Sequence, residues 1–217
     1  MHIAEGVLPP VILGSCAALT AAGVCIGLKK LDYDRIMTTA ILSAAFFVAS
    51  LIHIPLGPVS GHLILNGLLG LLLGWVAFPA ILVALTLQAI LFQFGGLTTL
   101  GVNTLNMALP PVLCFYIFRP MLMKGSFSLK TAAFFCGLTA VALSAVLTSG
   151  SLALGGDSFI NSAKILLVSS APIMVVEGLV TAVVVGFLVK VTPQIFPFQV
   201  KQPEPARAAQ PATNIQE

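Results

Sequence analysis

The chain has 217 residues, of which 58% are hydrophobic and only 8% are charged, and its mean hydropathy is +1.07. This composition excludes a soluble globular domain and indicates a polytopic membrane protein. The formal net charge of +3 is small, and we expect no nucleic-acid partner. The length allows one compact helical bundle and no separate large domain.

Apolar segments bordered by Gly, Pro or charged residues recur along the chain and predict an all-α membrane bundle of about seven transmembrane segments. They are Val11–Leu28, Ile36–Ile54, His62–Val76, Phe78–Phe94, Thr104–Phe118, Ala132–Thr148 and Ile165–Val189. The third and fourth segments are barely separated, and each falls short of the ~20 residues that a simple span needs. We therefore expect a tilted or broken pair of helices there.

The chain divides into two parts by composition. Residues 1–190 hold all the apolar segments and are predicted to form one membrane-embedded domain. Residues 191–217 contain five prolines among alanines and polar residues, and we expect a flexible Pro/Ala-rich tail. The chain opens with a histidine and a glutamate instead of a basic n-region, so we expect no cleaved signal peptide.

The basic residues predict the orientation in the membrane. If the N-terminus is outside, all but Lys164 of the ten Lys and Arg residues fall in cytoplasmic loops or the tail. Such a bias places the N-terminus on the exterior and the C-terminus in the cytoplasm. We therefore expect a multi-pass protein of a prokaryotic inner membrane, with its first residues facing the exterior.

Met1 and His2 can build most of a metal site. A bulky second residue normally prevents removal of the initiator methionine, so we expect a free α-amine on Met1. That amine, the backbone nitrogen of His2 and Nδ1 of its imidazole can close a five-membered and a six-membered chelate ring around one ion. A planar set of nitrogen donors suits Ni(II) or Cu(II), and Co(II) also fits. The alternative is a frayed terminus without function.

The fourth nitrogen must come from another histidine. His62 follows the Gly57-Pro58-Val59-Ser60-Gly61 stretch, a loose re-entry on the exterior side that is tolerated in a membrane where it lines a cavity. His53 ends the second segment near the same surface and is the alternative. We favour His62, with Ser60 as a candidate for the surroundings of the site.

A second group of polar residues follows the fourth segment on the same side of the membrane. It consists of Gln88, Gln93, Gly95, Gly96, Thr98, Thr99, Gly101, Asn103, Thr104 and Asn106. Amides there can orient a metal-bound imidazole through its other ring nitrogen. The alternative is an ordinary polar loop with a helix cap. Glu177 is the sole acid within a predicted span, and we expect it to hold a loop or helix in place rather than to bind the metal.

Five stretches of this sequence together resemble the CbiM/NikM family. They are the opening Met-His-Ile, the Gly57 to His62 stretch, Gly95-Gly96-Leu97, Asn106-Met107-Ala108 and Glu177-Gly178. These proteins are the substrate-binding components of energy-coupling factor transporters, and the resemblance covers about residues 1–190. It implies that the N-terminus dips into the bundle and that Met1, His2 and His62 bind Co²⁺ or Ni²⁺ as transported cargo. It also implies a transmembrane coupling protein, two ATP-binding cassette ATPase subunits and often a small auxiliary membrane subunit.

The sequence agrees with such a division of labour, because it contains no phosphate-binding G-x-x-x-x-G-K-[ST] loop. Gly14, Ala18 and Ala22 recur at four-residue spacing and form a candidate partner-contact face, or alternatively an internal packing face. We expect no enzymatic activity and no permanent cofactor. The alternative function is a stand-alone permease or channel, and that class should show ionisable residues in several spans.

Overall fold

The computed structural model describes residues 2–56, 59–124 and 128–200, and the side chains of residues 53–56 and 59–61 lie outside this description. Within these ranges the chain forms helices and one short β-hairpin, which confirms the predicted all-α class. The helices are α1 (Pro10–Lys29), α2 (Ile36–Ala49), α3 (Asn66–Leu73), α4 (Ala77–Phe92), α5 (Leu100–Lys124), α6 (Leu129–Ala153) and α7 (Ile160–Val191). The antiparallel hairpin joins β1 (His53–Leu56) to β2 (Val59–His62).

Seven α-helices match the seven predicted segments in order, but only 5 stretches of the described chain are long and apolar enough to cross a membrane. Helix α2 has only 14 residues, because the chain enters the hairpin where a longer span was expected. Helices α3 and α4 together form one stretch of 27 residues. They are separated by a 3₁₀ turn that starts at Gly74, whose φ of 53° favours glycine. The predicted broken pair is therefore one interrupted span.

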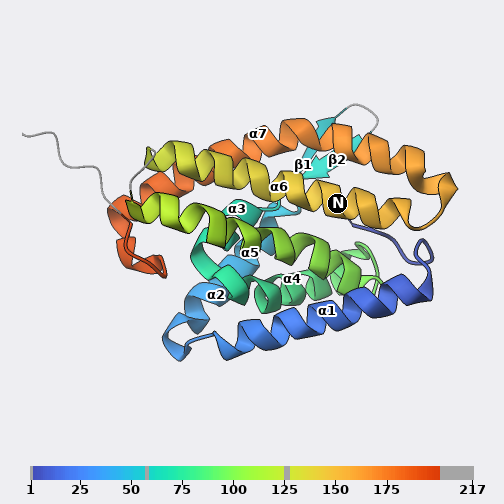
Figure 1. Ribbon diagram of the computed structural model, residues 1–217, viewed down its shortest axis with the longest axis horizontal. Helices are drawn as coiled ribbons and strands as arrows, with labels where there is room; N and C mark the ends of the chain where they lie inside the picture. The colour runs from blue at the N-terminus through green and yellow to red at the C-terminus, as the bar shows by residue number, and fades with distance from the viewer. Residues whose placement is uncertain (1, 57–58, 125–127, 201–217) are drawn as a thin grey trace, which may run out of the picture.

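The helices surround α3, which lies inside the bundle with all of its residues buried. Helices α6 and α7 run side by side along one side, α1 lies on the opposite side, and α5 lies between them (Figure 1). Glycines allow these neighbouring helices to pack closely. A Cβ at Gly67 of α3 would lie 2.4 Å from the Cα of Gly137 on α6, and a Cβ at Gly101 would lie 2.7 Å from the Cα of Ala17 on α1.

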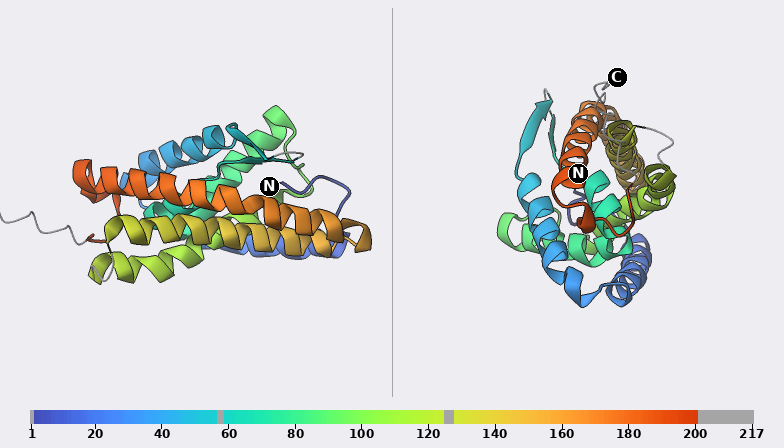
Figure 2. Two further views of the ribbon diagram at one scale, coloured as in Figure 1. Left: turned by 90° about the horizontal axis from the view of Figure 1, so that it is seen from above. Right: turned by 90° about the vertical axis from the view of Figure 1, so that its left-hand side faces the viewer.

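The chain before α1 turns back from the end of that helix and enters the bundle (Figures 1 and 2). Ile3 and Leu8 are buried and pack with Val102 of α5 in a small separate apolar cluster. Burial of these apolar side chains, together with the hydrogen bonds described below, stabilises the inserted segment. The predicted insertion of the N-terminus into the bundle is thus confirmed for the described residues.

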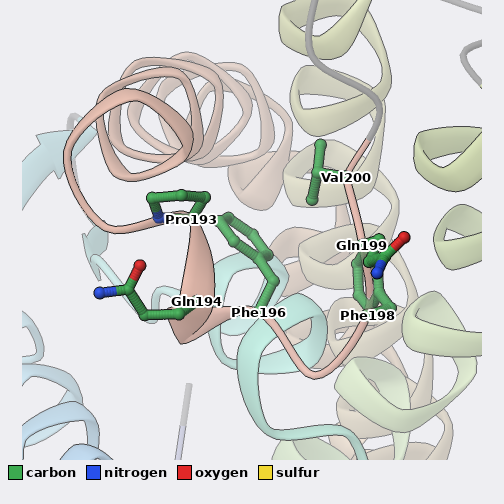
Figure 3. Close-up of a pocket in the computed structure, with 6 residues that line it drawn as sticks. All are labelled: Pro193, Gln194, Phe196, Phe198, Gln199 and Val200. Atoms are coloured by element: carbon green, nitrogen blue, oxygen red, sulfur yellow. The ribbon is translucent and has the colours of Figure 1, made fainter.

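The structured part of the chain extends beyond the predicted domain boundary. Phe196 and Phe198 are buried against the bundle, Arg35 donates a hydrogen bond of 3.0 Å to the carbonyl of Ile195, and the Arg119 guanidinium lies 5.8 Å from the Phe198 ring centroid. Figure 3 shows this segment folding over the end of the bundle. A flexible tail starting at residue 191 is therefore wrong for residues 192–200, because two phenylalanines anchor them. Residues 201–217 lie outside the described residues.

Candidate metal centre

Asn103 of α5 holds the inserted N-terminal segment. Its side-chain oxygen accepts a hydrogen bond from the backbone N–H of Ile3 at 2.9 Å, and its amide nitrogen donates to the carbonyl of Ile3 at 3.1 Å. Asn103 is itself buried and also donates to the Thr99 hydroxyl. A side-chain amide that pairs with both polar groups of one residue satisfies two buried backbone groups and fixes the position of the chain there. The position of the preceding residue, His2, follows from this clamp.

The Gly-Gly motif lets the loop between α4 and α5 lie against the inserted segment. Gly95 has a φ of 78°, and a Cβ there would lie 2.7 Å from the Asn103 amide nitrogen. A Cβ on Gly96 would overlap the side chain of Glu5. The Glu5 carboxylate in turn accepts a hydrogen bond of 3.1 Å from the backbone N–H of Thr98. The two glycines therefore serve close backbone approach, which side chains would prevent.

His2 and His62 lie face to face. Their ring centroids are 5.0 Å apart with an interplanar angle of 29°, and the Phe94 ring lies 5.8 Å from the His2 ring. His62 is buried and His2 is half-buried. The site therefore joins the N-terminal segment to the end of β2, two parts of the chain that are far apart in sequence.

Hydrogen bonds indicate which nitrogen of each imidazole carries a hydrogen. Nε2 of His2 lies 3.0 Å from the side-chain oxygen of Gln88, and Nδ1 of His62 lies 3.1 Å from the carbonyl of Leu63. Oxygens of amides and carbonyls only accept hydrogen bonds, so these two nitrogens are the donors. In the neutral rings the lone pairs are then on Nδ1 of His2 and Nε2 of His62. For His2, this assignment is the one that the predicted chelate requires.

Glu177 of α7 anchors the segment that follows His62. One carboxylate oxygen accepts hydrogen bonds from the backbone N–H groups of Ile64 and Leu65, the latter at 2.8 Å. Leu65 has a φ of 56° and immediately precedes α3. A carboxylate at this position satisfies N–H groups at a helix N-terminus and opposes the positive end of its dipole. Glu177 thus contacts the backbone beside His62, in keeping with the positional role expected for it.

The other sequence-predicted residues are spread more widely. Gln93 ends α4 with an exposed side chain, and Asn106 exchanges hydrogen bonds of 3.1 and 3.2 Å with Ser151, linking α5 to α6. Met1 and the side chains of His53 and Ser60 lie outside the described residues. The hairpin register pairs the backbone of His53 with that of His62.

The candidate partner-contact face lies on the outside of the bundle. Gly14, Ala18 and Ala22 are all exposed, whereas α1 packs inward through Thr20, Gly23 and Gly27. The structure therefore disfavours the alternative of an internal packing face for these three residues.

The sequence placed Gln88 in the polar group whose amides could orient an imidazole, but the candidates selected from that group were Gln93, Asn103 and Asn106. The signal was present, because an amide in the middle of an apolar helix is costly unless it has a partner. Gln88 is fully buried and lies five positions before Gln93. The residues next to it in α4 are apolar. Its position relative to His2 depends on the packing of the N-terminal segment, which the sequence of α4 does not specify.

No group of three or more His, Cys, Asp or Glu side chains converges anywhere in the described ranges. The fold and the paired imidazoles define a multi-pass membrane protein whose inserted N-terminal segment brings a histidine to a second histidine inside the bundle. The family model described as "cobalt uptake substrate-specific transmembrane region" matches residues 2–195. The chain belongs to this family, CbiM.

Relatives and solved structures agree with the family assignment. A Haemophilus influenzae protein assigned to metal transport is 43% identical over 90% of this chain and 96% of its own. An Archaeoglobus fulgidus protein described as a fused nickel transport protein, NikMN, is 30% identical over 90% of this chain and 68% of its own. The crystal structure of a transition metal transporter superimposes with a TM-score of 0.76 at 27% identity, over 88% of this chain and 93% of that one.

Proposed function

We propose that this protein captures Co²⁺ or Ni²⁺ as the substrate-binding membrane subunit of an ATP-driven importer of the energy-coupling factor type. The observation that carries the proposal is the pair of imidazoles, with ring centroids 5.0 Å apart, whose hydrogen bonds place lone pairs on Nδ1 of His2 and Nε2 of His62. Nδ1 is the only ring nitrogen of His2 that can share a six-membered chelate ring with its own backbone nitrogen.

The proposed ion site has four nitrogen donors in one plane. They are the α-amine of Met1, the backbone nitrogen of His2, Nδ1 of His2 and Nε2 of His62. This proposal requires that Met1 is the first residue of the mature protein and that its amine is unmodified, which mass spectrometry of the purified protein checks. A strong-field nitrogen plane suits Ni(II), and Co(II) also accepts nitrogen ligands. The name of the Archaeoglobus relative favours nickel, and the family description favours cobalt.

The proposed orientation places the metal site near the exterior. The connection between α1 and α2, the C-terminal end of α5, the start of α6 and the end of α7 lie at one end of the molecule (Figure 1). Most Lys and Arg residues belong to these segments, whereas Lys164 begins α7 at the other end. The positive-inside rule then places the first end in the cytoplasm of a prokaryotic cell and the N-terminal segment toward the exterior face of the inner membrane.

Energy for uptake is proposed to come from partners: a transmembrane coupling protein, two ATP-binding cassette ATPase subunits and a small auxiliary membrane subunit. The exposed face of Gly14, Ala18 and Ala22 on α1 allows another helix to approach closely and is the proposed contact for the coupling protein. The competing function is a stand-alone permease. Glu177 is the sole buried carboxylate among the described residues, which is poor support for an ion pathway of ionisable groups.

Transport assays separate these two functions. Cells that produce this chain alone should take up radioactive nickel or cobalt no faster than cells with an empty vector, whereas co-production of the coupling protein and ATPases should raise uptake severalfold. A coupling complex whose ATPases lack their phosphate-binding lysine is the control. ATP-independent uptake by the chain alone would favour the permease.

Proton release tests the composition of the ion site. The reference pKa is about 7.7 for an α-amine and about 6.5 for imidazole, and a backbone amide gives up its proton only to a metal. Protons compete with the ion at each donor, so affinity should weaken markedly as the pH falls from about 8 to about 6. Nickel titration in weakly buffered solution should release more than one proton per ion, with the visible absorption of a planar diamagnetic complex. Release near zero would remove the N-terminal chelate from consideration.

A further inference from the structure

Gln88 is fully buried in α4, and its side-chain amide makes two hydrogen bonds, one through its oxygen and one through its nitrogen. Its side-chain oxygen lies 3.0 Å from Nε2 of His2, and its side-chain nitrogen lies 2.8 Å from the hydroxyl oxygen of Ser50, the residue that caps α2. The Ser50 hydroxyl in turn lies 2.6 Å from the carbonyl of Phe47. A chain of hydrogen bonds therefore connects the backbone of α2 to the imidazole of His2.

The far end of this chain fixes the direction of every hydrogen bond in it. The Phe47 carbonyl can only accept, so the Ser50 hydroxyl hydrogen points to it, and the Ser50 oxygen is left as the acceptor for the Gln88 amide nitrogen. The amide then cannot be turned by 180°, because its oxygen would face the Ser50 oxygen, whose only hydrogen is already donated to the Phe47 carbonyl. The Gln88 oxygen consequently faces His2, and Nε2 of His2 must carry the hydrogen.

We infer that Gln88 is a positioning residue that fixes the tautomer and the orientation of His2 so that Nδ1 can bind the ion. The inference rests on the proposed role of His2 as a metal ligand. Partners of the second ring nitrogen commonly orient metal-binding histidines, and their removal typically lowers affinity about 10–100-fold. Here the orientation comes from two helices of the bundle, α2 and α4, which are separate from the segment that carries His2.

Three variants test the inference. Gln88→Leu keeps the size of the side chain but removes both hydrogen bonds, and it should weaken nickel binding about 10–100-fold. Ser50→Ala lets the amide rotate and should give a smaller loss. Thr86→Val is the matched control on the same helix. The Thr86 hydroxyl donates a hydrogen bond to the carbonyl of Leu82 within α4, so this variant should bind as the wild type does. Thermal unfolding without metal checks that each variant is folded.

A direct reading of the tautomer distinguishes positioning from a merely structural role. In metal-free protein with ¹⁵N-labelled histidine in detergent micelles at about pH 8, where imidazole is neutral, the His2 signals should show hydrogen on Nε2. The His2→Ala variant assigns these signals. Gln88→Leu should give a mixture of tautomers while the His62 signals stay unchanged.

The outcomes separate this inference from the proposed function. If His2→Ala abolishes nickel binding but Gln88→Leu binds within twofold of the wild type, the role of Gln88 is overturned and the proposed site stands. A wild-type His2 that carries its hydrogen on Nδ1 overturns the inference as well, and this reading does not depend on whether Gln88→Leu folds. If His2→Ala binds nickel as the wild type does, the proposed function itself fails.

Discussion

A single glycine added before Met1 is expected to lower the nickel affinity of the purified protein tenfold or more. The extension turns the Met1 nitrogen into an amide that must lose a proton to bind the ion. The new amine can reach the ion only at the corner of the plane that is assigned to His62, which must then leave. The chain cannot shift to compensate, because Asn103 pairs with both backbone groups of Ile3 and the loop at Gly95 and Gly96 lies against the same segment. Isothermal titration in detergent measures the change.

A matched variant separates this effect from the general effect of a tag. The same glycine extension placed after Glu217, far from the described site, should leave affinity unchanged. Acetylation of the Met1 amine should reproduce the loss without changing the length of the chain, because an amide nitrogen replaces the basic amine. Equal affinity of the extended, acetylated and native proteins would mean that the α-amine is not a ligand.

His2→Ala and His62→Ala are each expected to abolish tight nickel binding in a protein that still folds. Each variant removes one of two imidazoles whose centroids are 5.0 Å apart. Helix packing should persist, since the main apolar core lies among α3, α4, α5 and α6 and contains neither histidine. Nickel titration measures binding, and thermal unfolding without metal should differ little from that of the wild type.

His53→Ala is the discriminating comparison, because the hairpin register places residue 53 directly opposite residue 62. It should bind nickel nearly as the native protein does. A loss as large as that of His62→Ala would assign the fourth nitrogen to His53 or add a fifth donor to the site.

Much of the fold could be predicted from apolar segments alone, because a bilayer requires long helices with satisfied backbone groups. The short third and fourth segments predicted a tilted or broken pair, and the resemblance to the CbiM/NikM family implied the insertion of the N-terminus. The hairpin was not predicted, because Pro55 and Gly61 are poor strand residues and its four-residue strands carry no clear alternation. The sequence also did not predict the packing of residues 192–200. The five prolines after residue 190 indicated a flexible tail, although the two phenylalanines among them are buried against the bundle.

Only some residues of the candidate site could be identified from the sequence. The chemistry of His2 and His62 could be read from residue type and position, and Glu177 stood out as a buried acid. The amide that faces His2 could not be chosen in the same way, because Gln88 and Gln93 both lie near the end of α4. Which of the two contacts His2 depends on the path of the N-terminal segment. Local sequence sets the available donors, and tertiary packing selects among them.

The clamp on Ile3 also determines when this site can form during synthesis. The first residues leave the ribosome before any of their partners exist: Gln88 and Asn103 follow about a hundred positions later, and Glu177, which anchors the segment after His62, lies in the last helix. Contacts of such large sequence separation form late in folding. The N-terminal residues must therefore wait outside the bundle until most of the chain has been inserted, and a truncated or stalled chain lacks the anchors that hold both histidines in place.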